Sequence, residues 1–595
     1  MESFKQRLGP DQLLIAAAFV TFSVSTIIWT IRDRTPPPWD PADHLTAAYD
    51  YAQPIAHADI AGFGREFFLE HHYYAPLVHL TTASVFLILG ASRQTGVVVN
   101  LLSMAVLMYS VYWIGGKLYG TPEQLNALVS TTDSDGLTAR GEEKLSRYLP
   151  SAGALAAVLS TSYHFPAWLL HDAFLDYPLT AIVAATMALL IRAGDFKTRR
   201  AAIWFGIAAG LGMLTKQTFI FFLVLPAFYC AIRVLMSRDR RAIGNFAIAV
   251  LITAAISAIW YAPHIRDVIE IYKINQQGAV DENEAPLFSF MSNVFYLHGL
   301  VSSQTQLFFG LLFAFGLVYS IVRKRRQTVM LYLWLVSGIA AFTFIANKDM
   351  RYTIPVLPAA ALISVCWACG FREPTHPRVR TSFVRNITAA VSLLVIGWAF
   401  VSFFNAQWPA AGSGIYIDTP RFRWMVFARN YFGFDHRPLQ NDWSVPAIIQ
   451  ATVELGQQGP AASSPPSVVR PVGDAPHDQA QRGAGSSMRP TLGVIVNLPH
   501  LNPSNISLYA RFEAARHWGL SPIDVDWLVN DSARPRVMTC DYILVRTGLA
   551  EADWVSPMER YAEQQMRSHP ESFVRQASFP IPLPNAEAVI YKCIR

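Results

Sequence analysis

The chain has 595 residues, of which 52% are hydrophobic and only 15% are charged, and its mean hydropathy is +0.27. Soluble domains are about a quarter charged, so this composition excludes a soluble globular protein. The 34 glycines, 37 prolines and 5 cysteines are too few for a collagen-like, low-complexity or disulfide-scaffold protein. The net charge of +6 does not indicate a nucleic-acid partner, because Lys and Arg lie in short clusters between apolar runs, as in cytoplasmic loops of membrane proteins. We therefore expect a polytopic α-helical membrane protein.

The first apolar run covers about residues 13–31 and follows Lys5 and Arg7. It is longer than the core of a cleaved signal peptide and lacks a small-residue cleavage site, so we expect a retained first span. A short run at 75–90 is predicted to lie along the membrane. Ten further runs have the length of a span, roughly 15 to 24 residues. They lie at 96–118, 151–170, 177–191, 201–214, 219–235, 243–261, 307–322, 329–346, 354–370 and 387–404.

Basic clusters set the predicted orientation of these spans. Four clusters follow the runs that end at residues 191, 235, 322 and 370, and the positive-inside rule places each of them in the cytoplasm. With the N-terminus also inside, we predict eleven spans, a C-terminus outside, and an outer loop that holds Asp172 and Asp176. Arg32 and Arg34 lie outside against the rule, but the four clusters outweigh them.

The pattern changes after residue 404. We predict a membrane domain at 1–404, a connecting segment at 405–490 with a Pro/Ser/Gly-rich linker, and a soluble α/β domain at 491–595 on the outer face. Cys540 and Cys593 flank two predicted strands of this domain and either form a disulfide or stay free thiols. Its predicted strands lie at 492–497, 542–546, 573–579 and 588–591, and its predicted helices at 504–518 and 558–566.

Acidic residues and histidines gather at the predicted outer face, where ionisable groups near spans tend to mark function. Residues 36–44 read PPPWDPADH, and rigid prolines there would aim Asp40, Asp43 and His44 at one spot. The alternative is a loop of solvated acids with a helix N-cap at Asp40 or Asp43. His71 and His72 follow in EHHYYAPL, a pattern that is also typical of an aromatic belt at the membrane surface.

Two further acids, Asp172 and Asp176, are four residues apart, so a helix would place both on one face. Asp176 could equally cap the next span, since Pro178 lies in its first turn. Three cations lie on the same side, where the positive-inside rule disfavours them: Lys216, Lys348 and Arg351. Snorkelling would explain Lys216 alone. The short turn around Lys348 and Arg351 favours a bound anion, and phosphate fits that description.

At these residues the chain resembles the GT-C glycosyltransferases, and in particular bacterial proteins similar to dolichyl-phosphate-mannose protein mannosyltransferases and lipid A aminoarabinose transferases. Five motifs occur in the family order over about the first 370 residues. They are WD at 39–40, YAPL at 74–77, DYPL at 176–179, LTK at 214–216, and NKDMRY at 347–352 with Pro355 and Pro358.

The resemblance implies inverting transfer of a sugar from a polyprenyl-phosphate donor to a hydroxyl or phosphate of a protein, lipid or polysaccharide acceptor. It implies a bacterial inner membrane, with the C-terminal domain periplasmic or extracellular. We expect the donor lipid to lie between spans, with the outer loop at 261–305 and its amphipathic stretch at 265–274 covering it. The expected base is Asp40, with Asp43 and His44 as supports or alternates. Donor-phosphate binding is expected from Lys216, Lys348, Arg351 and Tyr352, and acceptor orientation from Asp172, Asp176, His71 and His72.

One departure concerns the first loop, because Pro41 follows Asp40 where many relatives have a second acid. The choice between Asp40 and Asp43 therefore stays open, as does a divalent cation, for which these two acids are the candidate ligands. No other cofactor is expected. A transporter or lipid flippase without glycosyl transfer is the competing class, although the sequence shows no internal repeat of the kind common in transporters. A non-catalytic membrane scaffold would leave the outer-face cations unexplained.

Overall fold

The computed structural model describes residues 9–70, 73–120, 150–281, 284–323, 328–370, 381–410, 414–428, 436–458, 489–549 and 555–594. These residues form two compact units, each considered by itself. The first, called the helical unit, comprises Met1–Trp29, His72–Val78 and Val99–Arg437. The second, called the α/β unit, comprises Thr30–His71, His79–Val98 and Pro438–Arg595. The α/β unit therefore combines most of the predicted first outer loop with the C-terminal domain.

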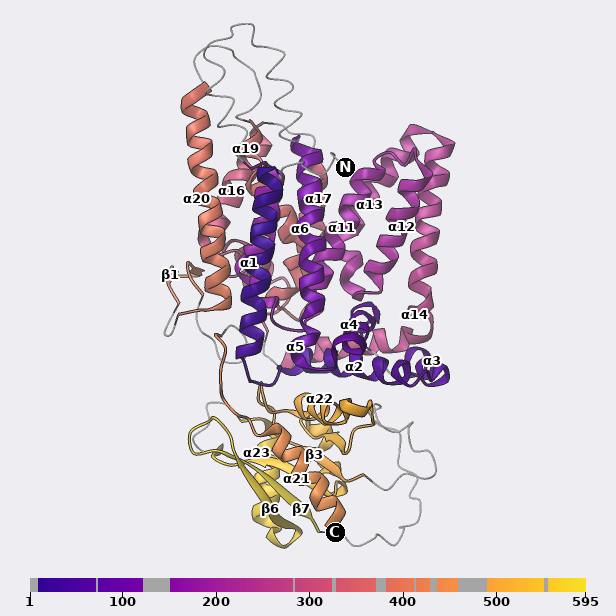
Figure 1. Cartoon of the computed structure of the whole chain (residues 1–595), viewed down its shortest axis with the longest axis vertical. Helices are drawn as coiled ribbons and strands as arrows, with labels where there is room; N and C mark the ends of the chain where they lie inside the picture. The colour runs from indigo at the N-terminus through magenta and orange to yellow at the C-terminus, as the bar shows by residue number, and fades with distance from the viewer. Residues whose placement is uncertain are drawn as a thin grey trace, which may run out of the picture. The chain divides into compact units, whose positions relative to one another are not determined.

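The helical unit consists of apolar helices, many of which run side by side along one direction (Figure 1). Six helical segments of the described chain are long and apolar enough to cross a membrane, and four shorter apolar helices accompany them. All eleven runs predicted as spans are helical over most of their length, while the number of crossings and their direction stay predictions. The elements are α1(Pro10–Arg32), α6(Val98–Tyr119), α9(Ala152–Ser162), α10(His164–Leu169), α11(Asp176–Ala193), α12(Arg199–Met213), η1(Gln217–Phe219), α13(Ile220–Ser237), α14(Arg240–Asp281), α15(Phe290–Val301), α16(Leu307–Val322), α17(Val329–Thr343), η3(Met350–Val356), α18(Leu357–Ser364), α19(Trp367–Gly370) and α20(Thr381–Gln407), with a small hairpin of β1(Tyr416–Asp418) and β2(Arg423–Met425).

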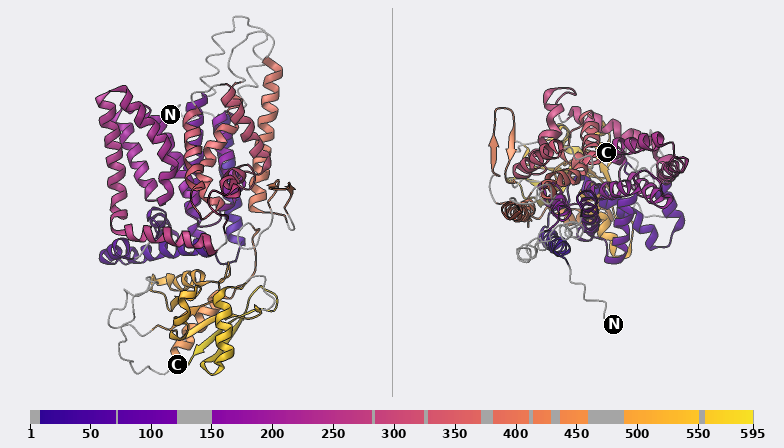
Figure 2. Two further views of the ribbon diagram at one scale, coloured as in Figure 1. Left: turned by 180° about the vertical axis from the view of Figure 1, so that it is seen from behind. Right: turned by 90° about the horizontal axis from the view of Figure 1, so that it is seen from above.

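Three predicted segments differ from the simple expectation of straight spans and loops. The run at 151–170 breaks at Tyr163, whose ψ of 144° lies outside the helical region. The run at 354–370 lies within a 3-10 helix and short α-helices, where Pro355 and Pro358 limit regular α-helical bonding. The expected loop after residue 261 is instead partly helical, since α14 kinks at His264, directly after Pro263, and continues to Asp281 (Figure 2).

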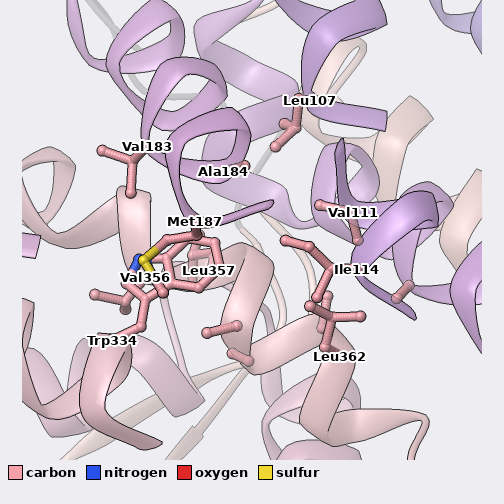
Figure 3. Close-up of a cluster of buried hydrophobic side chains, with 14 of the residues drawn as sticks. Leu107, Val111, Ile114, Val183, Ala184, Met187, Trp334, Val356, Leu357 and Leu362 are labelled. Carbon is pink, nitrogen blue, oxygen red and sulfur yellow. The ribbon is translucent and has the colours of Figure 1, made fainter. Parts of the chain in front are cut away.

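The core of the helical unit packs around η3 and α18. Figure 3 shows side chains of α6, α11 and α17 around Val356, Leu357 and Leu362 of this segment; they are Leu107, Val111, Ile114, Val183, Ala184, Met187 and Trp334. Small residues allow close helix approach here, because a Cβ added at Gly115 would lie 2.4 Å from the Cα of Gly153. The segment that carries Arg351 and Tyr352 is thus held by dense packing on its C-terminal side.

The α/β unit contains a five-stranded mixed sheet in the order β4-β3-β5-β7-β6. Strand β3 pairs in parallel with β4 and β5, whereas β7 pairs antiparallel with β5 and β6. Alternate side chains face opposite sides. Leu544 and Ile590 pack in one apolar cluster with Ile448 and Ile506 of helices, while Ile543 packs in a second cluster. The elements of this unit are α2(Trp39–Ala56), α3(Ile60–Phe68), α4(Leu77–Leu89), α5(Arg93–Gly96), α21(Val445–Gln458), β3(Thr491–Val494), α22(Pro503–Ala514), η4(Ala515–His517), β4(Asp524–Trp527), η5(Asp531–Thr539), β5(Tyr542–Arg546), α23(Pro557–Ser568), η7(Pro570–Ser572), β6(Phe573–Pro580) and β7(Glu587–Cys593).

The predicted strands and helices of the C-terminal domain are confirmed, but strand β4 and helix α21 were not predicted. Strand β4 reads Asp-Val-Asp-Trp, which is too polar and short for a clear strand pattern. Helix α21 lies in the segment expected to connect the domains, yet Ile448 and Ile449 are buried. Cys540 and Cys593 are buried free thiols, so the structure has the unpaired alternative.

Candidate functional site

A buried ion pair joins two of the predicted site residues in the helical unit. Asp176 begins α11, and Lys216 lies in the turn between α12 and η1. The Lys216 Nζ lies 2.7 Å from Asp176 Oδ1, and the two side chains are only 11% and 2% exposed. The alternative role of Asp176 as a helix cap is not seen, because α11 has no side-chain cap and this carboxylate instead pairs with Lys216. Because both groups are buried, removing either charge would leave the other without compensation in a poorly solvated environment.

The turn that carries Lys216 also contacts the predicted YAPL motif. The backbone N–H of Leu77 donates to the carbonyl of Leu214 at 2.9 Å. Two motifs that are far apart in the sequence are thereby joined by a backbone hydrogen bond.

Arg351 is held at the start of η3 by its neighbour Asp349. The Arg351 Nε donates to Asp349 Oδ2 at 2.6 Å, and the Arg351 backbone N–H donates to Asp349 Oδ1 at 2.9 Å. The guanidinium Cζ also lies 4.6 Å from the ring centre of Phe174, a cation–π distance. Gln304 fixes the same turn by donating to the Met350 carbonyl and to Thr353 Oγ1, at 2.5 and 2.8 Å. These contacts orient the guanidinium.

The ring of Tyr352 brings the two cations together. Lys216 Nζ lies 5.5 Å from the ring centre, and Arg351 Cζ lies 5.9 Å from it. The Tyr352 hydroxyl donates to Asn347 Oδ1 at 3.2 Å. We call Lys216, Arg351 and Tyr352 the cation cluster. It combines an ammonium, a guanidinium and a hydroxyl, the groups that proteins use to bind phosphate.

Lys348 has a different setting from the other two predicted cations. Its Nζ donates to the carbonyls of Phe342 and Thr343, at 3.0 and 2.8 Å, and lies 5.4 Å from the ring centre of Tyr296. These carbonyls are among the last of α17, so the ammonium satisfies a helix C-terminus. The structure thus gives Lys348 a capping contact.

The predicted acceptor residues occupy a neighbouring part of the helical unit. His171, which was not predicted but directly precedes Asp172, stacks on Trp29 with ring centres 3.5 Å apart, and its Nδ1 lies 3.4 Å from Gln407 Oε1. Asp172 is 4% exposed, and its backbone carbonyl accepts a hydrogen bond of 2.6 Å from Asn100 Nδ2. His71 and His72 lie outside the described residues.

The first-loop acids lie in the α/β unit. Asp40 is in the first turn of α2, and Asp43 follows one turn later, both half-buried. Burial raises the pKa of Asp43 to about 7, while a hydrogen bond with Ser504 lowers it, the charge of Asp40 raises it and that of Arg511 lowers it. His44 Nδ1 and His79 Nε2 share a buried hydrogen bond of 3.2 Å. A pKa near neutrality makes Asp43 a titrating neighbour of Asp40.

A metal site was left open for these acids. Among the residues that the structure describes, no three His, Cys, Asp or Glu side chains are placed to hold a metal ion. We assign no step to a metal.

Polar residues of the C-terminal domain that the sequence did not single out contact the first loop. They are Asn497, His500, Ser504, Asn505 and Arg511. Only their tertiary contacts identify them, since scattered Asn, Ser and His residues are common in any soluble domain.

Replacing Asp176 by asparagine is expected to lower the free energy of unfolding by about 3 to 5 kcal/mol, because the buried Lys216 would lose its compensating charge. Thermal or denaturant unfolding of the detergent-solubilised protein measures this. Asp418→Asn is the matched control, since its pair with Arg423 is exposed to solvent and such pairs contribute little to the free energy of unfolding. Equal stability of the two variants would contradict the assigned cost.

The chain is similar to known proteins in one segment of sequence and in fold. Residues 144–266 match the family model described as dolichyl-phosphate-mannose-protein mannosyltransferase, a range that includes Asp172, Asp176 and Lys216. No curated protein sequence matches the chain. ArnT from Cupriavidus metallidurans in the apo state matches with a TM-score of 0.50 and 14% identity, over 97% of each chain. The arabinofuranosyltransferase AftD from Mycobacteria matches with a TM-score of 0.50 and 12% identity, over 99% of this chain and 40% of AftD.

The two solved structures confirm the predicted fold class, a mostly helical chain with several apolar helices and a small C-terminal sheet domain.

Proposed function

We propose that the chain, which shares its fold with ArnT and AftD, is a GT-C glycosyltransferase that transfers a sugar from a polyprenyl-phosphate donor to an acceptor hydroxyl or phosphate. The reaction takes place at the extracytoplasmic face of a bacterial inner membrane and inverts the anomeric carbon. The acceptor is a protein, a lipid or a polysaccharide.

The cation cluster is the observation that carries this proposal. Two cations at the ends of apolar helices are costly unless they have a ligand or partner. Asp176 and Asp349 balance Lys216 and Arg351 and hold them in place. Because the groups are fixed before the donor arrives, little reorganisation is needed when charge develops on the leaving phosphate. Tyr352 adds a hydroxyl to the same place, and Lys348 supports the site through the end of α17.

The proposed chemical step is an in-line displacement at the anomeric carbon. The carboxylate of Asp40 takes the proton of the acceptor hydroxyl, and the acceptor oxygen forms the new bond to the carbon. The bond from that carbon to the phosphate oxygen breaks, and its electron pair leaves with the polyprenyl phosphate. Lys216 and Arg351 stabilise the additional negative charge. Asp40 is the first choice for the base because Trp39-Asp40 resembles the acidic motif of the GT-C family, and Asp43 and His44 are its alternates.

The remaining candidates take supporting roles. Asp43 and His44 lie in the next turn of α2 and set the charge beside Asp40. Asp172 and His171 are buried near the start of α11 and help to orient the acceptor, together with Asp176. His71 and His72 keep the same proposed role on the basis of sequence alone.

A comparison of cell envelopes tests the proposed function and the competing transporter class. Cells that produce the chain are expected to carry an envelope component heavier by one sugar residue than the same component in cells that lack it. Mass spectrometry of protein, lipid and polysaccharide fractions measures the added mass and identifies the sugar and the acceptor. A transporter or flippase would change the distribution of a compound across the membrane without forming a new glycosidic bond, so identical masses in all fractions would refute glycosyl transfer.

A further inference from the structure

Residues of the C-terminal domain bind the backbone of the proline-rich segment directly before Asp40. His500 Nδ1 lies 2.6 Å from the carbonyl oxygen of Pro36, and Asn505 Nδ2 donates to the carbonyl of Pro37. Asn497 Oδ1 accepts from Trp39 Nε1 at 2.7 Å. Pro36, Pro37 and Trp39 are therefore each held by a side chain from one distant part of the chain.

These contacts use the backbone groups that the prolines still offer. Proline has no N–H, so the carbonyl oxygens are the only backbone hydrogen-bonding groups of residues 36–38. Pro38 is the N-cap of α2 and provides no side-chain cap. His500 and Asn505 are 1% and 0% exposed. Burying such polar side chains is unfavourable unless they form hydrogen bonds, and here those bonds go to the segment that leads into α2.

The contacts continue along α2, which packs against α22. Asp43 is hydrogen bonded with Ser504, and Arg511 Nε donates to Asp50 Oδ1 at 2.6 Å. The Tyr49 hydroxyl donates to the carbonyl of Gly519 at 2.9 Å. Of the charged groups that act on Asp43, Asp40 lies on the same helix and Arg511 on α22. The acids of the first loop thus have their surroundings completed by α22.

We propose that residues of the C-terminal domain are positioning residues of the transfer site. Their contacts fix the position and the surroundings of Asp40 and Asp43 in the first loop. These positioning residues are Asn497, His500, Ser504, Asn505 and Arg511. The catalytic meaning of these contacts rests on the proposed function, whereas the contacts themselves are observed within the α/β unit. Ser504 is the most direct member, since it acts on a side chain of the acid pair itself.

Ser504→Ala tests the inference in the full-length protein. The serine hydroxyl stabilises the ionised form of Asp43, so its loss is expected to raise the pH at which Asp43 becomes deprotonated, by about one pH unit. Carbodiimide labelling reports this directly, because carbodiimides modify protonated carboxyl groups. Labelling of the peptide that contains residues 39–56 is followed by mass spectrometry from pH 5 to pH 9 and needs neither donor nor acceptor.

Ser507→Ala is the matched control, since it removes the same hydroxyl three residues later in the same helix. The Ser507 side chain is half-buried, and its replacement keeps the backbone carbonyl that accepts a hydrogen bond from Arg511. The labelling midpoint of this control is expected to equal that of the wild type, and Ser504→Thr, which keeps a hydroxyl, is expected to restore it. In the pH–rate profile of sugar transfer, the pH at which the rate rises on the acidic side should shift upward with the labelling midpoint. This shift is expected in Ser504→Ala alone.

Equal labelling midpoints in Ser504→Ala and Ser507→Ala would overturn the inference, whether or not the wild type transfers sugar. A shifted midpoint with an unshifted rate profile would overturn the positioning role and leave glycosyl transfer intact. Absence of any sugar transfer by the wild type refutes the proposed function, and that result is obtained separately from the labelling.

Discussion

Asp40→Asn is expected to lower the rate of sugar transfer by about two to four orders of magnitude, the usual effect of removing a general base. Asparagine has nearly the same shape as aspartate but cannot take the proton of the acceptor. The variant should therefore bind donor as the wild type does and lose turnover. Product formation per minute, measured on the fraction that gains mass in the envelope comparison, gives the rate.

Two further variants make this result specific to Asp40. Asp59→Asn is the matched control, because Asp59 is exposed and caps α3 through Gly62, a role that asparagine also fills. Its rate is expected to equal that of the wild type. Asp43→Asn is expected to retain measurable transfer while losing the dependence on pH near 7, because the titrating neighbour is gone. Wild-type turnover in both Asp40→Asn and Asp43→Asn would eliminate a first-loop base, and loss in Asp43→Asn alone would move the role to Asp43.

Arg351→Ala and Lys216→Ala are expected to weaken donor binding by about tenfold to a hundredfold each, as for a hydrogen-bonded charge worth about 1.5 to 3 kcal/mol. Undecaprenyl phosphate, which carries the lipid and the phosphate but no sugar, serves as the probe. Its dissociation constant is measured with purified protein in nanodiscs. Arg351→Lys should recover only part of the affinity, because lysine keeps the charge but not the planar fork of donors.

Arg233→Ala provides the control for the arginine variant. Arg233 also pairs with an aspartate in the helical unit, but the side chains of Arg233 and Asp195 are 53% and 40% exposed. Its affinity for undecaprenyl phosphate is expected to match that of the wild type. If Arg351→Ala and Arg233→Ala bind the probe equally well, the cation cluster does not hold the donor phosphate. Because Lys216→Ala also leaves Asp176 buried without its partner, the arginine variant is the decisive one.

The helices and strands could largely be read from the sequence, since apolar runs of membrane length and alternating strands are local signals. The positions at which these helices break or bend could not be read from the sequence. Tyr163 lies inside the run at 151–170, whose length and overall hydropathy predict one span, whereas its backbone conformation shows that α9 ends there. The sequence predicted an amphipathic stretch at 265–274 but not that it continues the preceding span, because a proline after an apolar run usually ends a helix, whereas α14 bends at His264 and continues.

The candidate site was predicted as a set of residues but not as a set of contacts. The cations and acids stand out because charge is scarce in this chain. The pairing of Lys216 with Asp176 spans 40 positions, and the capping contact of Lys348 depends on where α17 ends. The roles of His500 and Asn505 gave no sequence signal at all, because their partners are the carbonyls of prolines rather than charged side chains.

The contact between Arg511 and Asp50 joins residues 461 positions apart. A ribosome synthesises the acid-bearing helix α2 long before it reaches α22, so for most of translation this helix lacks the groups that hold it. If the nascent chain folds in step with its synthesis, the acids of α2 lack these contacts until the C-terminal domain has been synthesised and has folded. The surroundings of the first-loop acids are therefore complete only after α22 has been synthesised and has folded.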